Sequence, residues 1–92
     1  MPEICRWDNG NINIDMYSFD NKKHKKPHIH VFYKDEAEYV YGLDGEVIEK
    51  EGNIPKKQRI EILNWINIRQ TELRREWNNA INGLEINKID PL

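Results

Sequence analysis

The chain has 92 residues, of which 33% are charged, and its formal net charge is −2. This length allows one small domain with a single core, and the slightly acidic balance excludes a globally basic nucleic-acid binder. Three tryptophans, four tyrosines and many isoleucines exclude a disordered chain, because disordered segments are poor in aromatic and β-branched residues. We therefore expect one folded domain spanning residues 1–92.

The residue types also limit the compartment and the class of metal site. Cys5 is the only cysteine, which excludes an internal disulfide and a zinc site built from four cysteines or from two cysteines and two histidines. No segment approaches the apolar length of a membrane span, and the first residues lack the pattern of a signal peptide. We expect a cytoplasmic protein with no membrane partner.

Alternation of apolar and polar residues predicts β-strands in the first half of the chain. Ile12, Ile14 and Met16 alternate with polar neighbours, and Asn9-Gly10 before them is a strong hairpin signal because both residues tolerate positive φ. Pro27 biases the preceding residue toward extended geometry, so a strand should begin directly after it. The five expected strands, all within residues 3–50, are 3–8, 11–18, 28–33, 36–43 and 46–50, joined as a mainly antiparallel meander.

Apolar residues recur at helical spacing in the second half of the chain. Pro55 suits a first helical turn, and Gly83 should end the helical region. An interruption at Arg69 predicts two helices, about 55–68 and 70–82, with one kinked helix as the alternative. The apolar stripe consists of Ile62, Leu63, Ile66, Leu73, Trp77, Ala80, Ile81 and Leu84.

Two further segments complete the expected fold. Trp65 and Ile68 point off the main stripe, so they should fill a second small cluster or form an interface, with core filling the favoured alternative. The tail 84–92 keeps three regularly spaced apolar residues and should pack back onto the domain. Because the stripe needs an apolar surface to cover, the two C-terminal helices should lie on one face of the sheet, which gives an α+β fold.

The stretch 22–33 contains all three histidines and the densest basic run of the chain. Side chains of a strand alternate between faces, so His28 and His30 should share one face while Ile29 lies on the other. If the helices bury the Ile29 face, the two imidazoles point outward or into a groove. His24 precedes them in a polar loop.

Three interpretations of the histidines remain open. As a metal site, His24, His28 and His30 could bind a divalent transition metal without thiolates, although the nearby lysines disfavour a dication. An additional oxygen ligand could come from Asp20, Glu36 or Glu38. As a metal-independent catalytic group, His28 and His30 would act as general base and general acid, with His24 assisting. As ordinary residues, they would contribute only hydrogen bonds or partner contacts.

The basic run beside the histidines favours an anionic ligand for the catalytic interpretation. Lys22, Lys25 and Lys26 are the candidate phosphate-binding residues, although a short lysine run is also typical of a solvated loop. Two imidazoles next to a phosphate-binding loop suit cleavage of RNA, in which the 2′-hydroxyl is the internal nucleophile. The sequence therefore favours a metal-independent ribonuclease if the protein is an enzyme.

The order of several motifs adds a family resemblance. The block His24-Lys25-Lys26-Pro27-His28-Ile29-His30-Val31 is the most specific of them. Flanking motifs are Met1-Pro2-Glu3-Ile4, Met16-Tyr17, Gly45-Glu46-Val47-Ile48-Glu49, Ile54-Pro55, Trp65, Glu72-Leu73, Trp77 and Ile89-Asp90-Pro91-Leu92. Together they cover nearly the whole chain, which resembles the small prokaryotic family called "domain of unknown function 4160".

This resemblance implies hallmark positions and a partner. The hallmark positions are His24, Pro27, His28 and His30, while Lys23 and Lys26 stand where the family usually has aspartate and proline. Proteins of this family are often encoded beside a small "domain of unknown function 2442" protein, and the pairs look like toxin–antitoxin modules in which this member is the presumed toxin.

These inferences together predict a toxin-like component of a toxin–antitoxin pair that cleaves or binds RNA. The expected partners are a small cognate antitoxin-like protein and RNA. The expected cofactor is either none or a divalent transition metal. The alternative is a non-enzymatic metal-binding or protein-interaction module.

Overall fold

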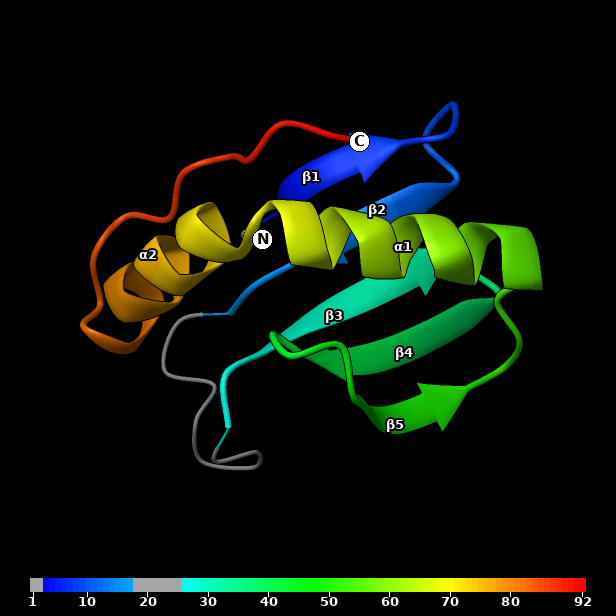
Figure 1. The fold of residues 1–92 in the computed structure, drawn as a ribbon, viewed down its shortest axis with the longest axis horizontal. Helices are drawn as coiled ribbons and strands as arrows, with labels where there is room; N and C mark the ends of the chain where they lie inside the picture. Colours follow the sequence, from blue (N-terminus) through cyan, green and yellow to red (C-terminus); the bar gives the residue numbers. More distant parts are fainter. Residues whose placement is uncertain (1–2, 18–25) are drawn as a thin grey trace.

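The computed structural model describes residues 3–17 and 26–92, and Figure 1 shows a sheet with a long helix lying across it. Five strands pair in chain order as an antiparallel meander, β1-β2-β3-β4-β5. The elements are β1 (Glu3–Trp7), β2 (Ile12–Asp15), β3 (His28–Tyr33), β4 (Ala37–Gly42), β5 (Val47–Glu51), α1 (Lys56–Ile68) and α2 (Gln70–Ile81). The predicted α+β class, meander and pair of helices are confirmed.

The core forms where the apolar faces of the strands meet α1. Ile14, Val31 and Tyr39 are direct neighbours across β2, β3 and β4, and all three are buried. Period-two alternation puts each of them on the same side of the sheet. Full burial of an isoleucine or valine side chain stabilises the fold by roughly 1.5–3 kcal/mol, so this face supplies much of the stability.

The buried stripe of α1 differs from the predicted one at two positions. Trp65 is fully buried, and its Nε1–H donates to the backbone oxygen of Asp90 at 2.8 Å, so the expectation that it points off the stripe is wrong. Leu63, expected on the stripe, is 42% exposed. The helix turns Ile62, Trp65 and Ile66 toward the sheet, a spacing of three and four residues that also fits one helical face.

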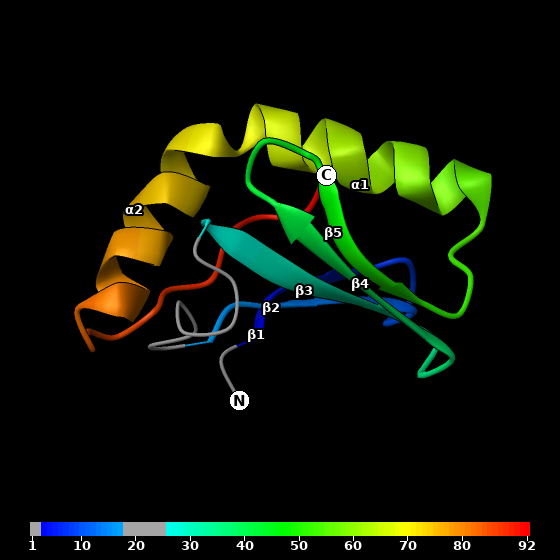
Figure 2. The same ribbon diagram turned by 90° about the horizontal axis from the view of Figure 1, so that it is seen from below.

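The two helices are separate and take different directions. The helical backbone conformation is interrupted at Arg69, which has φ −96° and ψ 24°, although its amide still donates to the Trp65 carbonyl oxygen at 2.9 Å. Figure 2 shows α1 above the sheet and α2 turned down past the end where β3 begins. Within residues 3–17 and 26–92, neither helix is long and apolar enough to cross a bilayer. The turn at Arg69 places α2 beside His28.

The first hairpin has a longer loop than the predicted Asn9-Gly10 turn. Trp7 pairs with Ile12, which leaves residues 8–11 as a four-residue loop. Asp8, Asn9 and Gly10 all have positive φ, at 59°, 56° and 83°. Trp7 packs on Trp65 with ring centroids 5.7 Å apart, so the register of the hairpin follows from packing as well as from turn chemistry.

The C-terminal tail packs against the edge strand β1, as predicted. The Ile89 amide donates to the Ile4 carbonyl oxygen at 2.7 Å, and the Asn87 amide donates to Glu76 Oε1 at 2.8 Å. The Glu76 carboxylate is fully buried. Burial opposes its charge, but the Asn87 amide and the Arg75 side chain outweigh burial and hold the pKa of Glu76 below its usual value. The tail is therefore fixed by a buried carboxylate.

Candidate active site on the outer face of the sheet

The outer face of the sheet, the side away from α1, carries the histidines of β3. His28 and His30 alternate with the buried Ile29 and Val31, and the two imidazole centroids lie 5.3 Å apart at an interplanar angle of 65°. The prediction that they share one strand face is confirmed. His30 lies between Asp15 on β2 and Val40 on β4, because the strand register makes all three cross-strand neighbours.

His30 is oriented by a carboxylate from the neighbouring strand. Its Nδ1 lies 3.0 Å from Glu38 Oε2, and the side chains of His30 and Glu38 are 14% and 39% exposed. A neutral imidazole that donates Nδ1–H to a carboxylate has its lone pair on Nε2. This is how a carboxylate sets the tautomer of a histidine general base in hydrolytic triads.

Asp15 and Tyr17 also lie beside His30. The Tyr17 hydroxyl donates to Asp15 Oδ2 at 3.2 Å, and the Tyr17 ring meets the His30 ring edge-on at 4.8 Å. Asp15 is only 4% exposed, and burial raises its pKa, an effect only partly offset by the Tyr17 hydrogen bond. A buried carboxyl with a raised pKa next to a histidine is typical of functional sites.

His28 is held more tightly than the sequence predicted. It is 1% exposed, and its ring packs on Trp77 of α2 with centroids 5.2 Å apart. Its Nδ1–H donates to the Lys26 carbonyl oxygen at 2.9 Å, which is the only role open to Nδ1 opposite a carbonyl. The expectation that both imidazoles lie clear of the core therefore holds for His30 and fails for His28, because α2 turns down over the start of β3.

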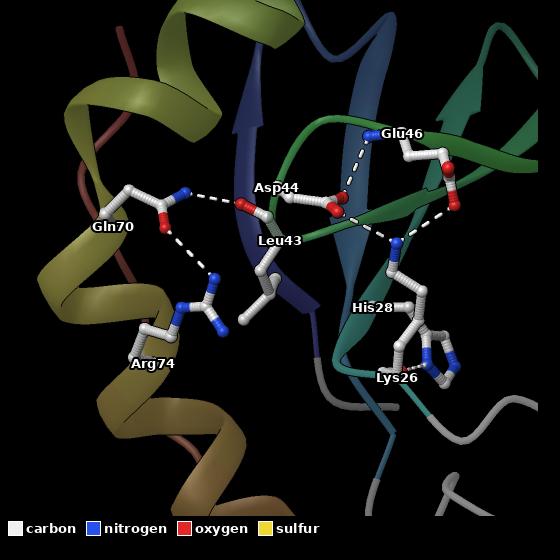
Figure 3. A network of polar contacts seen from close by, with 7 residues as sticks. All are labelled: Lys26, His28, Leu43, Asp44, Glu46, Gln70 and Arg74. Atoms are coloured by element: carbon white, nitrogen blue, oxygen red, sulfur yellow. Dashed lines mark hydrogen bonds and ion pairs between the residues drawn. The ribbon is translucent and has the colours of Figure 1, made fainter.

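Lys26, a predicted phosphate ligand, contacts two carboxylates. Figure 3 shows its ammonium between Asp44 and Glu46, and both N···O distances are 2.9 Å. The hydrogen bond from Lys26 holds the pKa of Asp44 below its usual value. Lys26 therefore ties the start of β3 to the loop between β4 and β5, and a phosphate would have to displace these carboxylates.

The same loop is also joined to the break between the helices. Gln70 donates to the Leu43 carbonyl oxygen at 2.5 Å, and Arg74 donates to Gln70 Oε1 at 3.5 Å (Figure 3). These contacts fix the first turn of α2 against the end of β4. They set the direction of α2, and with it the position of Trp77 over His28.

The remaining predicted site residues lie outside the residues that the structure describes. These are His24, Lys22 and Lys25, all within the segment 18–25. Among the described residues no group of three or more histidine, cysteine or acidic side chains is arranged to hold a metal ion. The metal interpretation, which needs His24, stays a prediction.

Sequence patterns missed the groups that surround His30. Asp15 and Tyr17 were expected only as polar positions of a strand, and Glu38 only as one of several oxygen donors for a metal. Their positions depend on the register between β2, β3 and β4, which pairs Asp15 with His30. No sequence signal marked Asp15, because it occupies an ordinary polar position of the alternating pattern and only the structure shows that it is buried.

Cys5 adds no reactive group to this surface. It is 3% exposed, and burial raises the pKa of its thiol to about 11. Since the thiolate is the nucleophilic form, this cysteine is inert at neutral pH. Cys5 instead packs in the core as a small buried residue.

Comparison with known families gives one match. The family Domain of unknown function (DUF4160) matches residues 11–78, a segment that contains His28, His30, Asp15 and Glu38. No curated protein and no solved structure matches the chain. Because the match covers more than half of the chain, the protein belongs to the family Domain of unknown function (DUF4160), as its motifs predicted.

Proposed function

We propose that this protein is the toxin-like member of a toxin–antitoxin pair and cleaves RNA without a metal, with His30 as general base. The observation that carries the proposal is the His30–Glu38 contact of 3.0 Å on the outer face of the sheet. The toxin assignment, and an antitoxin-like partner of the "domain of unknown function 2442" type, rest on the family resemblance alone. The basic run 22–26 next to the histidines supports an anionic substrate.

The proposed base is oriented by a carboxylate on the adjacent strand β4. With Nδ1–H donated to Glu38, His30 accepts the proton of a ribose 2′-hydroxyl at Nε2. The 2′-oxygen then attacks the adjacent phosphorus, the bond from phosphorus to the 5′-oxygen breaks, and a 2′,3′-cyclic phosphate forms. The leaving 5′-oxygen needs a proton from a general acid.

Asp15 is better placed than His28 to supply that proton. Asp15 lines a hollow of 520 Å³ on the outer face, and burial raises its pKa, so it keeps its proton to a higher pH than an ordinary aspartate. His28 is packed under Trp77, which suits a residue that supports His30 from the side. In this proposal His28 is a positioning residue, which revises the sequence-based assignment of base and acid to the two histidines.

The test is cleavage of a fluorescent single-stranded RNA by purified protein. His30→Gln should lower the rate by roughly 10²–10⁴-fold, the usual contribution of a general base. Asp15→Asn should remove the alkaline limb of the pH–rate profile, because the neutral amide cannot lose a proton in that range. Glu85→Gln, an exposed tail residue, is the matched control and should cleave like the wild type.

Unchanged cleavage by His30→Gln would show that the activity comes from elsewhere or from a contaminant. A second test uses growth. If expression of the wild type inhibits growth and the His28→Ala/His30→Ala double variant inhibits it equally, the histidines are not catalytic.

A second candidate function is protein interaction without catalysis. The observation that favours it is the excess of carboxylates over cations around the hollows of the outer face, among the residues described. Melting curves with and without Zn²⁺ or Ni²⁺ test whether such a non-enzymatic module binds a metal. A ligand that binds only the folded state raises the melting temperature.

A further inference from the structure

Two hollows on the outer face meet at one aromatic ring. The larger, the Arg6 hollow, has a volume of 520 Å³, and the smaller, the Glu51 hollow, has a volume of 230 Å³. Phe32 and Asp35 line both. Phe32 is half-buried and stands on the same side of β3 as His30, two residues further along. An aromatic ring therefore lies at the centre of a polar surface.

Carboxylates surround this ring. Among the residues that the structure describes, six acidic side chains line the two hollows, against one cation, Arg6. They are Glu3, Asp15 and Asp35 in the Arg6 hollow, with Glu36, Glu38 and Glu51 joining Asp35 in the Glu51 hollow. Arg6 is itself engaged, since it pairs with Glu3 at 2.8 Å and donates to Asn13 at 2.8 Å. The surface around Phe32 is thus negative.

We propose that this Phe32 surface docks a basic protein segment, with an arginine side chain of that partner stacked on the Phe32 ring and paired with the carboxylates of the two hollows. Neither the catalytic role of His30 nor RNA cleavage is needed for this interaction. A partner bound here would lie next to His30 and would restrict access to it.

Charge and shape favour an arginine over other occupants. A guanidinium is planar and stacks on aromatic rings while its N–H groups pair bidentately with carboxylates. Glu38 stands directly across from Phe32 in the strand register, and Asp35 lies in the turn that follows β3. In the Glu51 hollow a phosphate backbone would instead meet several carboxylates, so that hollow disfavours RNA. Lys26, the one residue of the lysine run that the structure describes, comes two residues before β3 begins, at the end of the strand away from Phe32.

The experiment measures binding of a fluorescent hexa-arginine peptide by anisotropy at low salt. Phe32→Leu should weaken binding by roughly three- to tenfold, because it removes the cation–π contact and keeps an apolar side chain. Asp35→Asn should weaken binding several-fold as well. The substitution is mild because Asp35 has φ 58°, a conformation that asparagine also adopts. Circular dichroism melting confirms that both variants fold.

Two controls separate docking at Phe32 from general attraction to an acidic protein. Glu85→Gln changes the net charge as Asp35→Asn does, but it lines neither hollow, so it should leave affinity within twofold of the wild type. A hexalysine peptide should bind more weakly than hexa-arginine. Equal effects of Asp35→Asn and Glu85→Gln, or an unchanged affinity in Phe32→Leu, would overturn the proposal.

A competition experiment with RNA tests whether the Phe32 surface binds a nucleic acid instead of a basic protein segment. A uridine octanucleotide should compete poorly with hexa-arginine for the wild type. If the oligonucleotide binds, and Phe32→Leu weakens its binding while hexa-arginine binds the variant as tightly as the wild type, the ring stacks on RNA bases. The arginine proposal is then wrong. If Phe32→Leu loses peptide binding while the wild type cleaves no RNA, docking at Phe32 is upheld and the catalytic role of His30 is refuted.

Discussion

The two faces of β3 come from the same six residues and differ in what determines them. On one face Ile29 and Val31 are fully buried under α1, and their neighbours across the sheet are also apolar. On the other face His28, His30 and Phe32 meet a mixture of neighbours: glycine, aspartate, valine, asparagine and glutamate. The first face is fixed by hydrophobic burial, which is not directional, whereas the second depends on specific hydrogen bonds.

This difference shows where stability and chemistry are separated in a small domain. A sheet covered on one side can hold its fold through one face and leave the other for binding. His28 is the exception, because α2 turns down and buries it on the outer face. Replacing a side chain of β3 should therefore lower the free energy of unfolding most on the core face, by an intermediate amount at His28 and least at the exposed outer positions. Variants along this one strand test that order.

The largest expected effect belongs to the core face. Ile29→Ala should lower the free energy of unfolding by about 2–5 kcal/mol, because it removes a fully buried side chain and leaves a cavity. Phe32→Leu on the outer face of the same strand is the comparison, with an expected loss below about 1 kcal/mol. Urea unfolding measures both. Similar losses for the two variants would show that the outer face is packed as tightly as the core.

His28→Ala should cost an intermediate amount, about 1–3 kcal/mol. The substitution leaves the Lys26 carbonyl oxygen without its imidazole donor and opens a gap beside Trp77. Near-ultraviolet circular dichroism would report the loosened Trp77, and urea unfolding gives the energy. A cost below that of Phe32→Leu would mean that α2 does not hold His28 as the structure indicates.

Asp15→Asn should change stability in the opposite direction. Burial raises the pKa of Asp15, so the folded state resists its ionisation. The resulting cost is absent at pH values below the ordinary aspartate range, about 3.9, and grows as pH rises through the raised folded value. At neutral pH we expect the variant to be more stable by about 0.5–1 kcal/mol, with the gap closing near pH 4.

Thermal melts of both proteins between pH 4 and pH 7.5 measure this gap. A variant that is less stable than the wild type at neutral pH, or a gap that widens in acid, would contradict the sign. The Tyr17 hydrogen bond is kept by an asparagine side-chain oxygen, so its loss would not account for such a result.

Glu38→Gln should have the smallest effect on stability, below about 0.5 kcal/mol. Glu38 is 39% exposed, and the attraction between partly exposed charges is weak in water. Its effect on RNA cleavage should be larger than its effect on folding, since the amide no longer stabilises a protonated His30. A melting temperature that falls as far as in His28→Ala would place Glu38 among structural residues.

The alternating patterns were sufficient to predict the core face and the helices. Ile29, Val31 and Tyr39 obey period two, and Arg69 interrupts the helical stripe at the observed break. Trp65 was misplaced because an apolar stripe can be drawn through several sets of helical positions, and only docking on the sheet selects one.

The candidate site could be predicted only in part. The alternation of His28 and His30 follows from one strand, but Asp15 and Glu38 are brought to His30 by register, and register depends on loops and packing across the sheet. The burial of His28 could not be anticipated either, since it results from the direction that α2 takes after residue 69, where Gln70 is tied to Leu43.

The most direct test of the proposed orientation of His30 is the imidazole tautomer, read from two-bond ¹⁵N–¹H correlations in mildly alkaline solution, where an ordinary imidazole is neutral. The geometry predicts that His30 carries its proton on Nδ1, donated to Glu38, and that His28 does the same toward the Lys26 carbonyl oxygen. A neutral His30 with the proton on Nε2 would contradict the account, because Glu38 would not then orient it as a base.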